Sequence, residues 1–171
     1  ADDRGPASII TANNVFAHAD DLIGIVEGIQ RLMAPDGVFV FEVSYLLDVD
    51  EQTLFDTIYH EHLAYHSVKP LVSFFQAHGL ELIEAERVSS HGGSLRGIVQ
   101  HAGGPHAVGP SIAQRLAEED RLKLDKSSTL QQFAVNIERN KQELIGVLDD
   151  LKRQGKSIAG FGAPAKATTL M

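Results

Sequence analysis

Apolar residues recur along the first third of the chain with two different periods. Residues 7–15 form a short apolar and β-branched run that ends in polar residues, which is typical of a buried strand followed by a loop. From Leu22 to Met33 the spacing is helical, after two aspartates that can cap a helix and before Pro35-Asp36-Gly37, which can end it. Residues 38–43 (VFVFEV) are almost continuously apolar, like a strand covered on both faces. The order strand, helix, strand predicts a parallel unit with a right-handed crossover.

The next part of the chain predicts helices followed by an antiparallel hairpin. A polar and acidic connection leads to a helix predicted over 53–58, and a second helix is predicted over 68–78, where Gly79 ends it. Strands predicted over 80–88 and 95–101 flank a short connection that contains glycine. We therefore expect an α/β fold in which a hairpin closes one edge of a parallel sheet.

The last third of the chain predicts long helices and then a new strand. Two polar amphipathic helices are predicted over 111–124 and 130–153, and the second is expected to pack on the sheet or to bridge to another domain. Residues 157–161 predict a strand, and 162–169 a Gly-rich loop with the start of a helix. Because the first and last predicted strands lack the neighbours that a parallel strand needs, we expect the chain to be part of a larger protein.

Composition narrows the class of partner. The 171 residues are 43% hydrophobic and 22% charged, which is enough for one sizeable core. A net charge of -8 without a run of Lys or Arg argues against nucleic acid. The absence of cysteine excludes disulfides and thiolate metal sites and favours a cytoplasmic location. No apolar run approaches the roughly 18 residues of a membrane span.

The segment Tyr59-His60-Glu61-His62 is the main candidate for acid/base chemistry. Residues 59–66 hold three histidines and two tyrosines, a density that favours a functional role over ordinary surface or core residues. His62 and His66 are four residues apart and open the alternative of a metal site. The spacing is not the His-Glu-x-x-His of metalloproteases, so we predict no metal.

Three further groups are candidates for binding. Asn13 and Asn14 follow the first predicted strand, where α/β sheets place ligands, although loop capping is an equal alternative. Arg96 has the charge to meet a diphosphate, whereas the glycines before it are explained by turn geometry. Gly162 and Lys166 open a predicted helix and suit an anion, or else form only a tight turn with a solvated lysine.

Four segments together resemble the S-adenosylmethionine-dependent nucleotide-sugar C-methyltransferases: ANNVFAH (12–18), FDTIYHEHLAYHS (55–67), HGGSLR (91–96) and GFGAPAKATTLM (160–171). The resemblance implies the second half of a class I methyltransferase sheet, which is Rossmann-like and ends in the antiparallel hairpin. It places the C-terminal part of that domain over 1–104, a helical connection over 105–155 and the start of a second Rossmann-like domain over 156–171.

The resemblance also implies a reaction, in which a base forms an enolate beside the ketone of a nucleotide-linked deoxysugar. The base is His62, with Glu61 and Tyr59 beside it and His18 lining the same pocket. No zinc-ligand cysteines and no glycine-rich cofactor loop precede Ala7, so most of the S-adenosylmethionine site is expected outside this chain, which alone should be inactive. Two alternatives stay open: a non-catalytic nucleotide-sugar or dinucleotide-binding module, and an oligomerisation unit built on the helix over 130–153.

Overall fold

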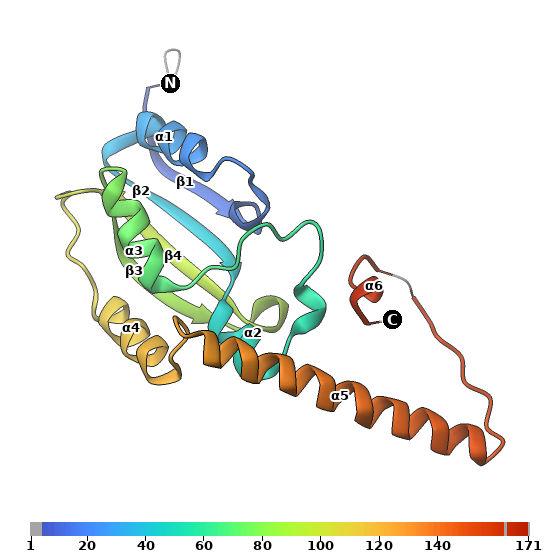
Figure 1. The fold of residues 1–171 in the computed structure, drawn as a ribbon. Coiled ribbons are helices and arrows are strands. Elements are labelled where there is room, and N and C mark those ends of the chain that lie inside the picture. The colour runs from blue at the N-terminus through green and yellow to red at the C-terminus, as the bar shows by residue number, and fades with distance from the viewer. Residues whose placement is uncertain (1–4, 163, 171) are drawn as a thin grey trace.

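The computed structural model describes residues 5–162 and 164–170, and its centre is a four-stranded mixed sheet (Figure 1). The strands lie in the order β1 (Ala7–Asn13), β2 (Met33–Ser44), β4 (Ser94–His101) and β3 (Leu80–Val88). β1 and β2 are parallel, and β4 is antiparallel to both of its neighbours. The predicted parallel unit and the hairpin are therefore confirmed, and the protein is a mixed α/β protein.

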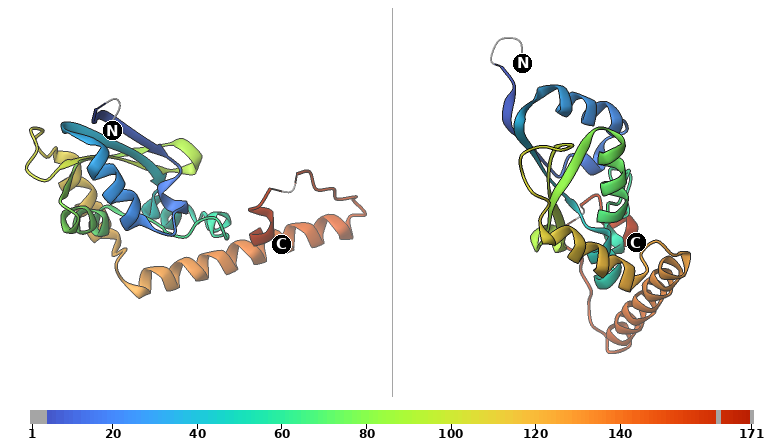
Figure 2. Two further views of the ribbon diagram at one scale, coloured as in Figure 1. Left: turned by 90° about the horizontal axis from the view of Figure 1, so that it is seen from above. Right: turned by 90° about the vertical axis from the view of Figure 1, so that its left-hand side faces the viewer.

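One face of the sheet is covered by α1 (Leu22–Leu32) and α3 (Val68–Ala77), which lie on the same side of the strands (Figure 2). The side chain of Asp21 caps α1 by accepting a hydrogen bond from Gly24 N at 2.8 Å, as the sequence predicts. The core between helices and sheet is built from buried aliphatic and aromatic side chains, including Val26, Ile29, Phe39, Phe41, Leu71 and Phe75.

The helix predicted over 53–58 is wrong. The chain instead forms α2 (Leu46–Gln52) directly after β2, a left-handed residue at Thr53 with φ 53°, and a single 3-10 turn, η2 (Phe55–Thr57). The acidic sequence of α2 suggested a connection, but Asp48 is buried because its carboxylate pairs with Arg87 at 2.9 Å from Nε. The local sequence pattern could not predict this ion pair, because Arg87 is far from Asp48 in the sequence.

Two other boundaries differ from the sequence prediction. Pro35 to Gly37 lie inside β2 and not in a loop, because the register between β1 and β2 shifts at Ala7 and leaves extra residues on β2. Residues 157–161 form no strand in the described structure, where no neighbouring strand is present to accept their backbone hydrogen bonds. A short helix, α6 (Ala167–Leu170), does follow the Gly-rich segment, of which Ala163 and Met171 lie outside the described residues.

The two long helices have different relations to the sheet. α4 (Pro110–Leu122) covers the outer edge of β3, where Gly109 N donates to Ile83 O and Ala85 N donates to the Ser111 hydroxyl. α5 (Ser127–Arg153) runs away from the sheet (Figures 1 and 2), and Phe133 is its buried side chain. Packing of α5 on the sheet is thus not observed, while its bridging role stays a prediction. None of the described helices is both long and apolar enough to cross a membrane.

Candidate functional site

Two segments far apart in the sequence meet beside the carboxyl end of β1. The first is the 3-10 turn η1 (Phe16–His18), which follows β1, and the second is the turn 59–62, in which His62 N donates to Tyr59 O. The carbonyl of Ala17 accepts hydrogen bonds from Leu63 N at 3.1 Å and from Ala64 N at 3.3 Å. These main-chain contacts place His18 next to the residues of the turn.

The rings of His18, Tyr59 and His62 lie together, and Glu61 contacts two of these residues. These four residues are here called the His62 cluster. The ring of His62 lies 4.9 Å from that of His18 and 4.7 Å from that of Tyr59, measured between centroids. A further ring, that of Tyr65, lies 6.1 Å away on the chain that follows the turn. The structure therefore brings together the four residues that the sequence nominated for acid/base chemistry.

His18 is held by the main chain of Glu61. Its Nδ1 lies 2.7 Å from the Glu61 carbonyl oxygen. Because a carbonyl oxygen only accepts, Nδ1 carries a proton and Nε2 of the neutral ring is an acceptor. His18 consequently donates a hydrogen bond through Nε2 only when the imidazole is protonated. Glu61 thus positions the His18 imidazole through its main-chain carbonyl.

His62 is enclosed enough to favour the neutral imidazole. Its Nδ1 is buried and has no hydrogen-bond partner among the described residues. Burial lowers the pKa of His62 below its ordinary value, the charges of His18 and Lys166 lower this pKa further, and the Thr57 backbone and Glu61 oppose them. A neutral histidine near physiological pH is a competent general base.

Tyr59 keeps its proton. Burial raises the pKa of the Tyr59 phenol, and the nearby Glu61 carboxylate raises it further. The hydroxyl donates to Glu61 Oε2 over 3.4 Å, a long contact that a closer acceptor can replace. Tyr59 is therefore the better hydrogen-bond donor of the cluster for an oxygen that gains negative charge.

Lys166 lies near the cluster but belongs to the C-terminal segment. Its ammonium is 3.7 Å from Asp56 Oδ2, and its charge acts on His62. Gly162 is exposed with φ 86°, as a Gly-rich turn requires, and nothing lies within 4 Å of the Cβ that another residue would carry.

The remaining candidates, Asn13, Asn14 and Arg96, lie around Glu42 near the carboxyl ends of β1 and β2. Asn13 pairs across the sheet with Glu42, and Glu42 pairs with Arg96. The Glu42 carboxylate accepts hydrogen bonds from the Ser90 hydroxyl at 2.5 Å and from Arg96 Nη2 at 2.9 Å, which lower its pKa. The side chains of Asn13 and Asn14 are exposed and have no hydrogen-bond partner in the described structure.

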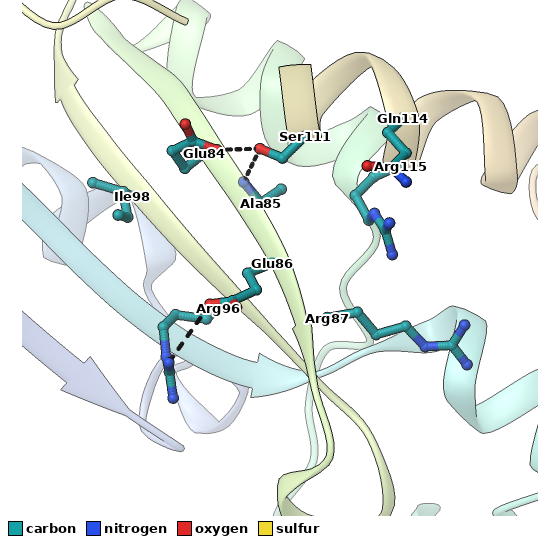
Figure 3. A pocket seen from close by; sticks show the side chains of 9 residues that line it. All are labelled: Glu84, Ala85, Glu86, Arg87, Arg96, Ile98, Ser111, Gln114 and Arg115. Carbon is teal, nitrogen blue, oxygen red and sulfur yellow. Dashed lines mark hydrogen bonds and ion pairs between the residues drawn. The ribbon is translucent and has the colours of Figure 1, made fainter. Parts of the chain in front are cut away.

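Arg96 is engaged by carboxylates. Besides Glu42, it approaches Glu86 at 3.7 Å, the ion pair drawn in Figure 3. The hollow in that view, of about 420 Å³, lies between α4 and the β3–β4 hairpin, and no residue of the His62 cluster lines it. Figure 3 also shows Arg87 turned away toward α2, where it meets Asp48. A diphosphate at Arg96 would have to displace the carboxylates already bound there.

In the segments 59–67 and 91–96, the surroundings of the glycines and of His66 are explained by packing. A Cβ on Gly93 would lie 2.2 Å from Asp48 Cγ, so the glycines of the hairpin connection are explained by packing and backbone geometry. His66 is 6% exposed with its ring 5.5 Å from that of Phe16, and burial lowers its pKa to about 4. His60 is exposed. Within the described residues no group of three or more His, Cys, Asp or Glu could hold a metal ion.

Sequence reasoning missed two positions that the structure brings to these groups. Glu42 interrupts the apolar run VFVFEV, and a charge inside a buried strand is a signal that could have found it. Asp56 carried no such signal, because its partner Lys166 is remote in the sequence.

Two family models and a curated relative match this chain. A model described as a methyltransferase domain matches residues 1–85, and a model described as a C-methyltransferase C-terminal domain matches residues 89–171. The chain belongs to the S-adenosylmethionine-dependent C-methyltransferase family. A family relative, C-methyltransferase NovU of Streptomyces niveus, is 34% identical over 168 residues. The match covers 98% of this chain and 40% of the relative, so the chain spans less than half of that C-methyltransferase.

Proposed function

We propose that the protein containing this chain transfers a methyl group from S-adenosylmethionine to a carbon beside the ketone of a nucleotide-linked deoxysugar. The observation that carries the proposal is the His62 cluster, in which a partly buried imidazole of lowered pKa contacts a second imidazole and a protonated phenol. Family membership supports the methyl transfer, and the cluster supports proton abstraction as the step that creates the nucleophile.

The roles within the cluster follow from the protonation states. Neutral His62 removes the proton next to the ketone. The electron pair of the broken C–H bond forms a carbon–carbon double bond, and the π pair of the ketone moves to its oxygen to give an enolate. The Tyr59 hydroxyl donates a hydrogen bond to this oxygen as its charge grows. Protonated His18 can make a second such bond, since its Nδ1–H is already committed to Glu61 O.

The exposed amides of Asn13 and Asn14 fit the polar part of the methyl donor. They follow the carboxyl end of β1, where α/β sheets bind ligands, and their side chains have no partner in the described structure. S-adenosylmethionine would supply an electrophilic methyl group there. The sheet order β1-β2-β4-β3, with one parallel pair and a terminal hairpin, supports the view that these strands are the second half of a class I methyltransferase sheet. In this proposal residues from 156 onward begin a second Rossmann-like domain.

The test separates proton removal from methyl transfer. In the full-length protein, His62→Ala should lower both methylation and the exchange of the acidic sugar hydrogen with deuterated solvent by about 10²-fold or more. His60→Ala is the matched control, because His60 is a neighbouring but exposed histidine. Retained exchange in His62→Ala removes His62 from the role of base. Absence of methyl uptake from a panel of keto-sugar nucleotides by the unmodified protein refutes the proposed reaction.

A further inference from the structure

The C-terminal segment is connected to the His62 cluster by three consecutive residues: Asp56 and Thr57 of the 3-10 turn η2, and Ile58 directly after it. Asp56 forms the ion pair with Lys166. The Thr57 carbonyl accepts a hydrogen bond from the Tyr65 hydroxyl at 2.9 Å. Burial lowers the pKa of the neighbouring His62, and the Thr57 backbone opposes this shift. The Ile58 carbonyl accepts a hydrogen bond from the Thr169 hydroxyl at 3.0 Å. The segment that carries Lys166 is therefore held at two points, Asp56 within η2 and Ile58 directly after it, just before Tyr59.

The position of Lys166 differs from that of a free phosphate-binding lysine. Its side chain is 38% exposed, and the Asp56 side chain beside it is 34% exposed. The pair together carries no net charge, and Asp56 would repel the negative charges of a diphosphate at that place. An oxygen that gains one partial negative charge during a reaction suits a lysine in this environment better.

We propose that Lys166, held in place by Asp56, is a further catalytic residue that contacts the enolate oxygen formed when His62 removes the sugar proton. In this step the carbon–hydrogen bond breaks, its proton goes to His62, and its electron pair forms the carbon–carbon double bond of the enolate. The π pair of the ketone moves to oxygen, and Lys166 stays protonated beside that oxygen. The inference rests on the proposed function and adds a residue to it.

Charged and titratable groups around His62 come from each packed segment. His18 faces it from η1, Tyr59 and Glu61 from its own turn, Tyr65 from the chain that follows, and Lys166 from the C-terminal segment. Of these, the Lys166 ammonium and a protonated His18 oppose the charging of His62, whereas Glu61 favours it. Removal of Lys166 therefore raises the pKa of His62 and moves the acid limb of the rate to higher pH.

The test compares Lys166→Met, Lys166→Arg and Asp56→Asn in the full-length protein, with the exposed Lys156→Ala as the matched control. Methionine keeps the aliphatic length of the side chain and removes only the charge. Each variant is assayed for kcat, for the KM of the keto-sugar nucleotide, for solvent exchange at saturating sugar, and for the pH profile of kcat/KM. Circular dichroism checks that each variant is folded.

We expect Lys166→Met to lower kcat and exchange by about 10²-fold with little change in KM, and to move the acid limb to higher pH. Lys166→Arg should recover part of the exchange, and Asp56→Asn should change it in the same direction as Lys166→Met. A raised KM with unchanged exchange and an unmoved acid limb would make Lys166 a diphosphate contact and overturn the proposal, as would unchanged kinetics. If the unmodified protein methylates its sugar and Lys166→Met does too, only this inference fails.

Discussion

Replacement of His66 by phenylalanine tests how strongly a buried histidine limits acid stability. His66 is 6% exposed, its Nε2 has no hydrogen-bond partner in the described structure, and its ring lies against Phe16. Burial lowers its pKa from 6.5 to about 4. His66 is therefore protonated below about pH 6.5 in the unfolded chain but only below about pH 4 in the folded chain. The contribution of His66 to the free energy of unfolding is consequently fully present above about pH 6.5 and is lost as the pH falls toward about 4.

The size of the effect follows from the two pKa values. Their difference of about 2.5 pH units corresponds to about 3.4 kcal/mol when the pH is below both values. Between pH 7 and pH 5 the imidazole alone costs the fold about 1.8 kcal/mol. His66→Phe removes this cost, since the new ring does not titrate and can pack in the same aromatic surroundings.

The assay is urea unfolding of this chain at pH 7 and pH 5, followed by far-ultraviolet circular dichroism. The free energy of unfolding of His66→Phe, minus that of the original chain, should rise by about 1.8 kcal/mol from pH 7 to pH 5. His60→Phe serves as control, because its imidazole is exposed and meets solvent in both states. A difference for His66→Phe that is the same at both pH values would show that His66 does not limit acid stability, and would refute the reasoning.

Two other variants test the framework of the site. Glu119→Ala should lower the free energy of unfolding in urea by about 3 kcal/mol, because the buried carboxylate accepts hydrogen bonds from the Tyr45 hydroxyl and from Val68 N and Lys69 N at the start of α3. Glu119→Gln should lose less stability, and equal losses for the two variants would contradict this explanation. Gly93→Ala should cost more than the roughly 1 kcal/mol expected for Gly103→Ala, since both glycines have positive φ but only Gly93 abuts Asp48.

Local periodicity predicted most of the sheet and helices because it reports burial directly. α1, α3, β3 and β4 lie within a few residues of their predicted ranges, since each has one apolar face or a continuous apolar run. α2 was missed because the charge of Asp48 is neutralised by Arg87, which is remote in the sequence. The strand over 157–161 was predicted from composition alone, and composition does not say whether a neighbouring strand is present.

In the candidate site, too, the sequence identified the residues but not the contacts between them. A dense motif marked Tyr59 to His62, and the resemblance added His18, yet the contact between them runs through the Glu61 carbonyl, which every residue possesses. The glycine-rich surroundings of Lys166 predict either an anion contact or a solvated lysine, and its ion-pair partner Asp56 lies in a turn over which the sequence predicts a helix. Ion pairs between residues far apart in the sequence, such as Asp56 with Lys166, could not be predicted from the local sequence pattern.

In the His62 cluster, the contacts that position the two segments are made by main-chain carbonyls and not by functional side chains. Ala17 O holds the chain after the turn, and Glu61 O holds the His18 ring, so neither contact depends on the identity of a side chain at position 61. The Glu61 carboxylate is 54% exposed, and among the described residues its contacts are long, at 3.4 Å to Tyr59 and 3.9 Å to His60. The carboxylate of Glu61 is therefore not what places His18 and Tyr59 next to His62.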